Sequence, residues 1–189
     1  MPLSNTSTRY GAITQWFHWA IVLLFVNQYV VAEIMIRWQA DAPFWGLTQG
    51  MLYNWHKSVG LIALGVALLR YTWRKTQRLP DWAEGLSPWE RRWVHGYERV
   101  LYAAMLIMPL SGYLFVEAGG YGVQWFGHLR LPTWLPRDDG LALLGRMIHI
   151  VTGYVIVIAL TCHVSLVLKH QWVDRDGLLY RMIPGRRDR

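Results

Sequence analysis

The chain has 189 residues, which suits one domain, and 53% of them are hydrophobic. Its 12 Trp and 10 Tyr are too many for an ordinary soluble surface, although long polar loops hold the mean hydropathy to +0.16. A formal charge of +7 could suggest a nucleic-acid partner, but the basic residues flank apolar segments instead of covering one soluble face. These features exclude an ordinary soluble domain, indicate no nucleic-acid partner and favour a membrane protein.

Four apolar segments, in chain order, are predicted to be transmembrane helices. They cover about residues 13–36, 53–73, 94–116 and 141–168, each long enough for a hydrocarbon core about 30 Å thick. The first is too long for a signal peptide and further segments follow it, so it is predicted to be retained. Polar or Gly- and Pro-rich loops over 37–52, 77–92 and 117–140 connect them. The predicted fold is all-α, a single membrane four-helix domain over residues 1–189.

The distribution of Lys and Arg predicts the orientation. If both termini share one side, that side carries fourteen Lys and Arg and the other side five. The positive-inside rule then places both termini in the cytoplasm. We therefore expect a multi-pass protein of a bacterial inner membrane, in contact with lipid.

The last apolar segment carries His149 and His163, fourteen residues apart. At about 100° and 1.5 Å per residue, this spacing places both on one helix face, about 21 Å apart along the axis. One imidazole should therefore lie near each membrane surface. Cys162, the only cysteine, lies in the same segment and is predicted to be a buried small apolar residue.

Two further histidines, His18 and His56, lie at the entrances of the first and second segments. In the predicted orientation, depth pairs His56 with His149 at the outer side and His18 with His163 at the inner side. Two paired imidazoles at two depths suit two six-coordinate haem irons held between helices. A zinc site would need three or four ligands at one depth. A proton relay, or ordinary interfacial histidines, stay open as alternatives.

Four other residues are candidates for these sites. Gly60 would let a flat macrocycle approach the backbone, or would simply permit close helix packing. Arg70, fourteen residues after His56, could pair with a propionate of the inner haem, or mark the basic membrane boundary. Lys57 and Arg146 could do the same for the outer haem. The remaining histidines, His95, His128 and His170, are predicted to be interfacial or loop residues, with His95 in reserve as a ligand.

Several short motifs together resemble the bacterial di-haem cytochrome b561 family of the inner membrane. The resemblance covers nearly the whole chain. It is carried by Phe17-His18-Trp19, the H-x-S-x-G motif from His56 to Gly60, Pro109-Leu-Ser-Gly112, the fourteen-residue spacing of His149 and His163, and the closing Leu178 to Pro184 segment.

The resemblance implies two non-covalent b-type haems with His18, His56, His149 and His163 as axial ligands. It also implies the activity of a superoxide oxidase, in which periplasmic superoxide gives an electron to the outer haem and ubiquinone is the acceptor. The chain differs from the family pattern in a long first outer loop, with Trp38, Phe44 and Trp45, and in Glu98, where the related sequence has histidine.

Physical arguments bear on that activity and on its alternatives. A cationic mouth, formed by Lys57 and Arg146, would raise the encounter rate with the superoxide anion. A second hypothesis is a membrane electron-transfer subunit that docks a partner redox enzyme. A third is a haem-free transporter or proton carrier that uses the same histidines.

Overall fold

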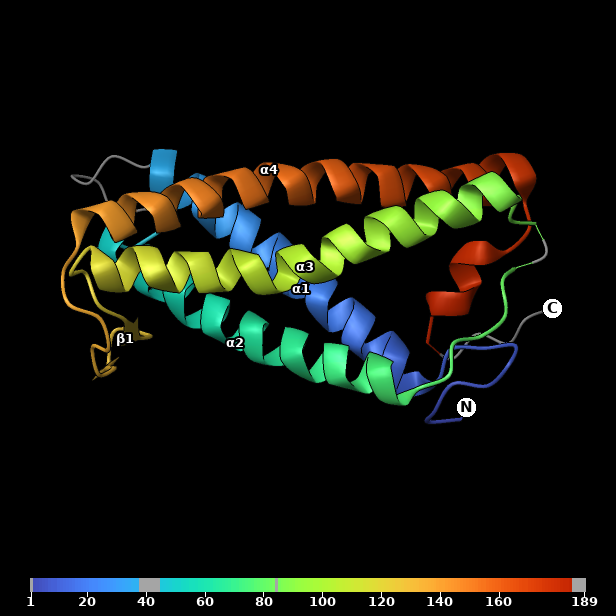
Figure 1. Ribbon diagram of the computed structural model, residues 1–189, viewed down its shortest axis with the longest axis horizontal. Helices are drawn as coiled ribbons and strands as arrows, with labels where there is room; N and C mark the ends of the chain where they lie inside the picture. Colours follow the sequence, from blue (N-terminus) through green and yellow to red (C-terminus); the bar gives the residue numbers. More distant parts are fainter. Residues whose placement is uncertain (1, 38–44, 84, 185–189) are drawn as a thin grey trace.

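A computed structural model describes residues 2–37, 45–83 and 85–184 of the chain. Four long helices, α1 (Ala12–Arg37), α2 (Gln49–Thr76), α3 (Pro88–Ala118) and α4 (Asp139–Lys169), alternate in direction and form one elongated bundle (Figure 1). Each apolar segment predicted from the sequence lies inside one of these helices. Trp38 and Phe44 of the long first loop lie outside the described residues.

Four short elements lie outside the long helices, two between α3 and α4 and two after α4. The α3–α4 connection, predicted to be only a loop, contains a two-residue antiparallel pair, β1 (Gln124–Trp125) and β2 (Leu129–Arg130). After α4 the chain continues as a π-helical turn, η1 (His170–Asp174), and then a 3-10 turn, η2 (Leu178–Met182).

The start of α3 also differs from the sequence prediction. The helix begins at Pro88, six residues before the predicted boundary at about 94. Ser87 accepts a hydrogen bond from the backbone N–H of Glu90, and Glu90 in turn accepts one from the backbone N–H of Ser87, which is a capping box. The Ser-x-x-Glu sequence carries this signal, but the apolar run alone does not.

The helices pack in a defined order. The most extensive contact joins α3 to α4, while α2 lies between α1 and α3. Gly145 of α4 permits the α3–α4 contact, because a Cβ atom there would lie only 2.7 Å from the backbone nitrogen of Phe115. The two backbones therefore approach more closely than larger residues would allow.

Three of the described helices are long and apolar enough to cross a membrane: α1, α3 and the continuous segment from α4 through η1. Their large apolar side chains also face outward, as with Leu23 and Ile158, which are 69% and 65% exposed. An outward apolar surface of this kind suits lipid. Cys162 is exposed, so the prediction that it is buried was wrong; it lies on the outward face of α4.

The first and last described segments lie at the same end of the bundle (Figure 1). The guanidinium of Arg181 donates hydrogen bonds to the carbonyl oxygens of Thr8 and Asp81, at 3.2 and 2.8 Å. The indole of Trp19 in α1 donates to the carbonyl of Met182 at 2.7 Å. We call this end, with residues 2–11, 77–87 and 170–184, the basic end, and the opposite end, with β1 and β2, the hairpin end.

Candidate functional site

The four histidines inside the helices form two pairs in space. The ring centroids of His18 on α1 and His163 on α4 are 6.1 Å apart, toward the basic end. Those of His56 on α2 and His149 on α4 are 6.2 Å apart, toward the hairpin end. We call these the basic-end pair and the hairpin-end pair. Helix α4 contributes one ring to each, and fourteen residues separate the two rings.

The separation of each pair suits an iron ion held between two imidazoles. A metal–imidazole nitrogen bond of about 2 Å on each side, plus a ring radius of about 1 Å at each end, places the centroids about 6 Å apart. Edge-to-face packing of two rings gives a similar distance. The distance alone therefore does not distinguish a metal-bound pair from packed rings, and the hydrogen bonds of the rings are the better criterion.

The imidazole nitrogens are only partly satisfied by the protein. The Nδ1 atom of His149 lies 2.8 Å from the carbonyl oxygen of Met108, which can only accept, so Nδ1 carries the proton and Nε2 is left free. The Nδ1 atoms of His56 and His163 are buried and have no hydrogen-bond partner among the described residues. Buried polar groups without partners are costly, so these rings fit sites completed by a bound group.

The hairpin-end pair lies in a closely packed, largely uncharged environment. A Cβ atom at Gly112 of α3 would lie 2.9 Å from the His149 ring. Gly60 lies against α1, because its Cβ position would be 3.1 Å from the Nε2 atom of Gln28. That amide donates a hydrogen bond to the carbonyl of His56 at 2.9 Å. Both glycines thus hold the histidine-bearing helices close to their neighbours.

The basic-end pair has a cation beside it. Arg70 of α2 interacts electrostatically with both rings of the pair, and its Cζ atom lies 5.6 Å from the centre of the Tyr102 ring. Its Nε and Nη1 atoms are buried and have no hydrogen-bond partner within the described part of the chain. A guanidinium in that condition fits an anionic group, such as a propionate, better than a simple boundary charge.

A cleft opens beside this arginine. It is only a shallow hollow, which borders the α1 entrance, the end of α2 and α3. The residues that line it are Asn5, Thr14, Phe17, Arg70, Trp73, Arg74 and Tyr102. Among these residues, Phe17 is the sequence neighbour of His18 in the basic-end pair.

The two cationic candidates at the hairpin end have different surroundings. The ammonium of Lys57 is half-buried and donates a hydrogen bond to the carbonyl of Gly122 at 3.0 Å, which ties α2 to the α3–α4 connection. Arg146 is exposed on α4, three residues before His149. Arg137, another cation at this end, lies 3.3 Å from a carboxylate oxygen of Asp139.

The other histidines lie apart from the two pairs. His95 is exposed and its ring packs edge-on against Trp82 at 4.9 Å, while His128 is exposed in the hairpin. The prediction for His170 was wrong, because this residue is fully buried among carboxylates. Glu98, one of the departures from the family pattern, forms an ion pair with Arg74 at 3.1 Å.

The arrangement as a whole brings two pairs of imidazoles together, one toward each end, with helix α4 contributing one ring to each. Comparisons with known proteins are in accord with it. The family model for prokaryotic cytochrome b561 matches residues 9–185.

Curated relatives extend over nearly the same length. Cytochrome b561 homolog 2 of Escherichia coli K12 is 26% identical over 97% of this chain and 95% of its own length. Cytochrome b562 of Cereibacter sphaeroides is 27% identical over 89% of this chain and 91% of its own. Cytochrome b561 homolog 1 of Escherichia coli K12 is 22% identical over 95% of this chain and 99% of its own length.

Proposed function

The chain belongs to the prokaryotic cytochrome b561 family, whose members are membrane electron-transfer proteins with haem b, and from this premise we propose that it is a superoxide oxidase. In this proposal all four helices cross the inner membrane and both termini are cytoplasmic. The basic end then faces the cytoplasm and the hairpin end faces the periplasm. The sequence count supports that orientation, because fourteen Lys and Arg belong to the side predicted to carry the termini and five to the other side.

Two non-covalent haem b groups are assigned to the two histidine pairs. His56 and His149 would hold the outer group, and His18 and His163 the inner one. When bound, each haem supplies a one-electron couple, and two axial histidines leave no open position for dioxygen chemistry. Arg70 would pair with a propionate of the inner group, and the glycines at 60 and 112 would keep the helices close enough to hold the outer one.

The proposed reaction moves single electrons from outside to the quinone pool. Each superoxide anion gives up one electron and leaves as dioxygen, and two such electrons with two protons convert ubiquinone to ubiquinol. Lys57 and the exposed Arg146 would attract the anion toward the outer pair.

One observation carries most of this proposal: two histidine pairs, each with ring centroids about 6 Å apart, lie toward opposite ends of one bundle. A proton relay would need a chain of readily ionised groups between them, whereas residues 150–162 of α4 contain no Asp, Glu, His, Lys or Arg. Electron transfer requires only two bound redox centres. The geometry therefore favours an electron carrier over a transporter that uses the same residues.

The test is a haem count followed by turnover. Purified protein should give a reduced-minus-oxidised spectrum of b type and about two haems per chain by pyridine haemochrome. Ubiquinone reduction should then follow superoxide generation and stop when superoxide dismutase is added. Colourless protein after haem-sufficient expression would favour the transporter. Two haems without superoxide turnover, together with stable co-purification of a redox enzyme, would favour the electron-transfer subunit.

A further inference from the structure

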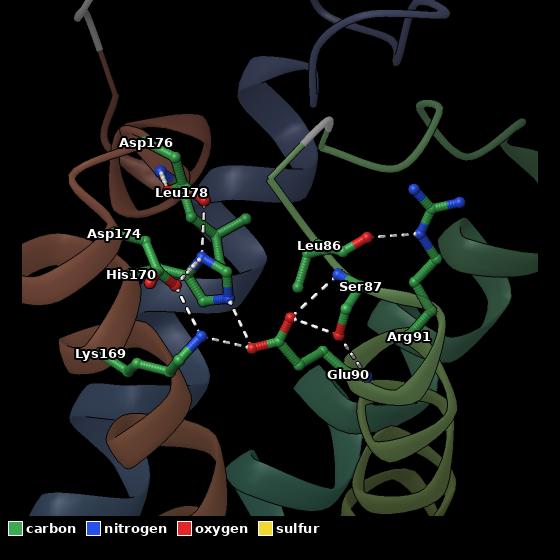
Figure 2. Close-up of polar contacts among 9 residues, drawn as sticks. All are labelled: Leu86, Ser87, Glu90, Arg91, Lys169, His170, Asp174, Asp176 and Leu178. Carbon is green, nitrogen blue, oxygen red and sulfur yellow. Dashed lines mark hydrogen bonds and ion pairs between the residues drawn. The ribbon is translucent and has the colours of Figure 1, made fainter.

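A cluster of charged side chains joins the start of α3 to the end of α4 at the basic end. Figure 2 shows Glu90 from α3, Lys169 from the end of α4, and His170 and Asp174 from η1 directed toward one another, with Asp176 behind the histidine. None of these residues contributes to the two histidine pairs. The cluster is therefore separate from the sites that the proposed function uses.

His170 is the centre of the cluster and has no exposed surface. Its Nδ1 atom lies 2.6 Å from a carboxylate oxygen of Asp176 and 3.2 Å from one of Asp174, and both oxygens can only accept, so Nδ1 carries a proton. Its Nε2 atom is buried, has no hydrogen-bond partner among the described residues, and faces Oε1 of Glu90 at 3.5 Å. In a neutral ring both of these facing atoms are acceptors, an arrangement that favours a cation between them.

The possible ligand atoms converge on one place. One atom each from Glu90, His170 and Asp174 lie within 4.8 Å of one another. The second oxygen of Glu90 accepts hydrogen bonds from the backbone N–H and hydroxyl of Ser87, at 2.9 and 2.7 Å, which fixes the direction of Oε1. Asp176 orients the imidazole as outer carboxylates orient metal-binding histidines elsewhere.

The position between the ligands attracts a cation already. The ammonium of Lys169 lies 2.7 Å from both Glu90 and Asp174. Its side chain is 46% exposed, so it can turn toward solvent without leaving a buried charge behind. The cluster contains three carboxylates and one ammonium, so a divalent ion would balance its charge better than the lysine does.

We propose that this cluster is a binding site for a divalent transition metal of the zinc class. The ligands are Nε2 of His170 and one carboxylate oxygen each from Glu90 and Asp174, with water in the fourth position. The ammonium of Lys169 moves out as the ion enters. The ion ties the first turn of α3 to η1 and closes the basic end of the bundle, which is a structural role independent of electron transfer.

The experiment uses the full, haem-loaded protein after treatment with EDTA, with Zn²⁺ alone as the probe. We expect about one tightly held zinc per chain by elemental analysis after desalting, and a higher thermal midpoint with zinc than without. His170→Gln should lose the bound zinc, and Asp176→Asn should weaken zinc binding about tenfold or more. The matched control is His128→Gln, which removes an exposed histidine at the other end and should change nothing.

A second variant keeps the test decisive if His170→Gln fails to fold. Lys169→Met removes the competing ammonium, so it should bind zinc more tightly than the natural chain, by about tenfold. If instead the cluster is only an internal ion-pair network, Lys169→Met should bind zinc no better. That result, or a zinc content that is the same in His170→Gln as in the natural chain, would overturn the proposal. Haem content measured in each sample separates these outcomes from failure of the proposed function.

Discussion

The two histidine pairs share one helix but lie in different surroundings. At the hairpin-end pair, His149 is held by the Met108 carbonyl and by the close approach of Gly112, so packing and one neutral hydrogen bond fix its ring. At the basic-end pair, the ring centroids of His163 and Tyr97 are 5.3 Å apart, and nearby lies Arg70, whose Nε and Nη1 atoms have no hydrogen-bond partner among the described residues. Close packing is the main feature of the hairpin-end pair, and a nearby cation is the main feature of the basic-end pair.

This difference suggests that the two histidine pairs, although similar, have different roles in electron transfer. A histidine pair fixed mainly by packing and one beside a buried cation should hold the same cofactor at different potentials, because nearby positive charge favours the reduced form. In the proposed orientation, the cation lies at the acceptor side. An electron that arrives at the outer pair would therefore be drawn inward.

The largest expected effect comes from removing one ligand of either pair. His149→Ala should abolish the hairpin-end haem and His163→Ala the basic-end haem, so that each variant retains about one haem of two by pyridine haemochrome. His95→Ala, in which an exposed ring is removed, should keep both. Loss of both haems from each ligand variant would show that the sites do not form independently and would contradict the comparison.

Packing around the hairpin-end pair can be tested with glycine variants. Gly112→Ala would place a methyl group 2.9 Å from the His149 ring, so we expect a loss of about 1–3 kcal/mol in stability and a lower occupancy of the hairpin-end haem. Gly96→Ala in the same helix meets no atom within 4 Å among the described residues and serves as the control. Thermal unfolding and haem spectra of the two variants give the comparison. Equal effects would contradict a specific role of Gly112.

Charge at the basic-end pair can be tested with Arg70→Gln. Removing this cation should lower the midpoint potential of the basic-end haem by about 60 mV, the one-electron equivalent of a tenfold change, and leave the other haem nearly unchanged. Lys75→Gln removes the same charge from an exposed position on α2 and should have a much smaller effect, because solvent screens it. A redox titration followed by absorbance distinguishes the two haems.

The smallest effect concerns the approach of superoxide to the hairpin end. Its bimolecular rate should fall as ionic strength rises, and Arg146→Gln should lower the low-salt rate by about twofold to fivefold. Arg146→Lys, which keeps the charge, should retain the natural rate. A salt profile that is flat for all three proteins would exclude steering by this residue. Stopped-flow mixing with superoxide provides the measurement.

The periodic features of the chain predict its long-range organisation well. Apolar runs indicated where the four helices lie, because burial in lipid requires a continuous apolar stretch. The fourteen-residue spacing placed two histidines on one face of α4, since helical geometry repeats over that distance. The same arithmetic predicts Arg70 at the level of His163.

Features that depend on distant segments could not be read from such patterns. His170 follows an apolar helix, as interfacial histidines do, yet its burial depends on a π-helical turn and on Glu90, eighty residues earlier. Ser58 is another example: its hydroxyl accepts a hydrogen bond from the backbone N–H of Phe126 at 2.8 Å. That contact depends on where the hairpin folds back, which local propensity does not determine.

The distance between the two pairs along α4 has an electrical consequence. An electron that passes from the level of His149 to that of His163 travels about 21 Å, or roughly two-thirds of a hydrocarbon core about 30 Å thick. Moving one charge across a whole membrane at 100 mV corresponds to about 2.3 kcal/mol, so this step corresponds to about 1.5 kcal/mol. In the proposed orientation the electron moves against an inside-negative potential. The distribution of electrons between the two ends would therefore depend on membrane voltage, and energised cells would retain more of them at the periplasmic side.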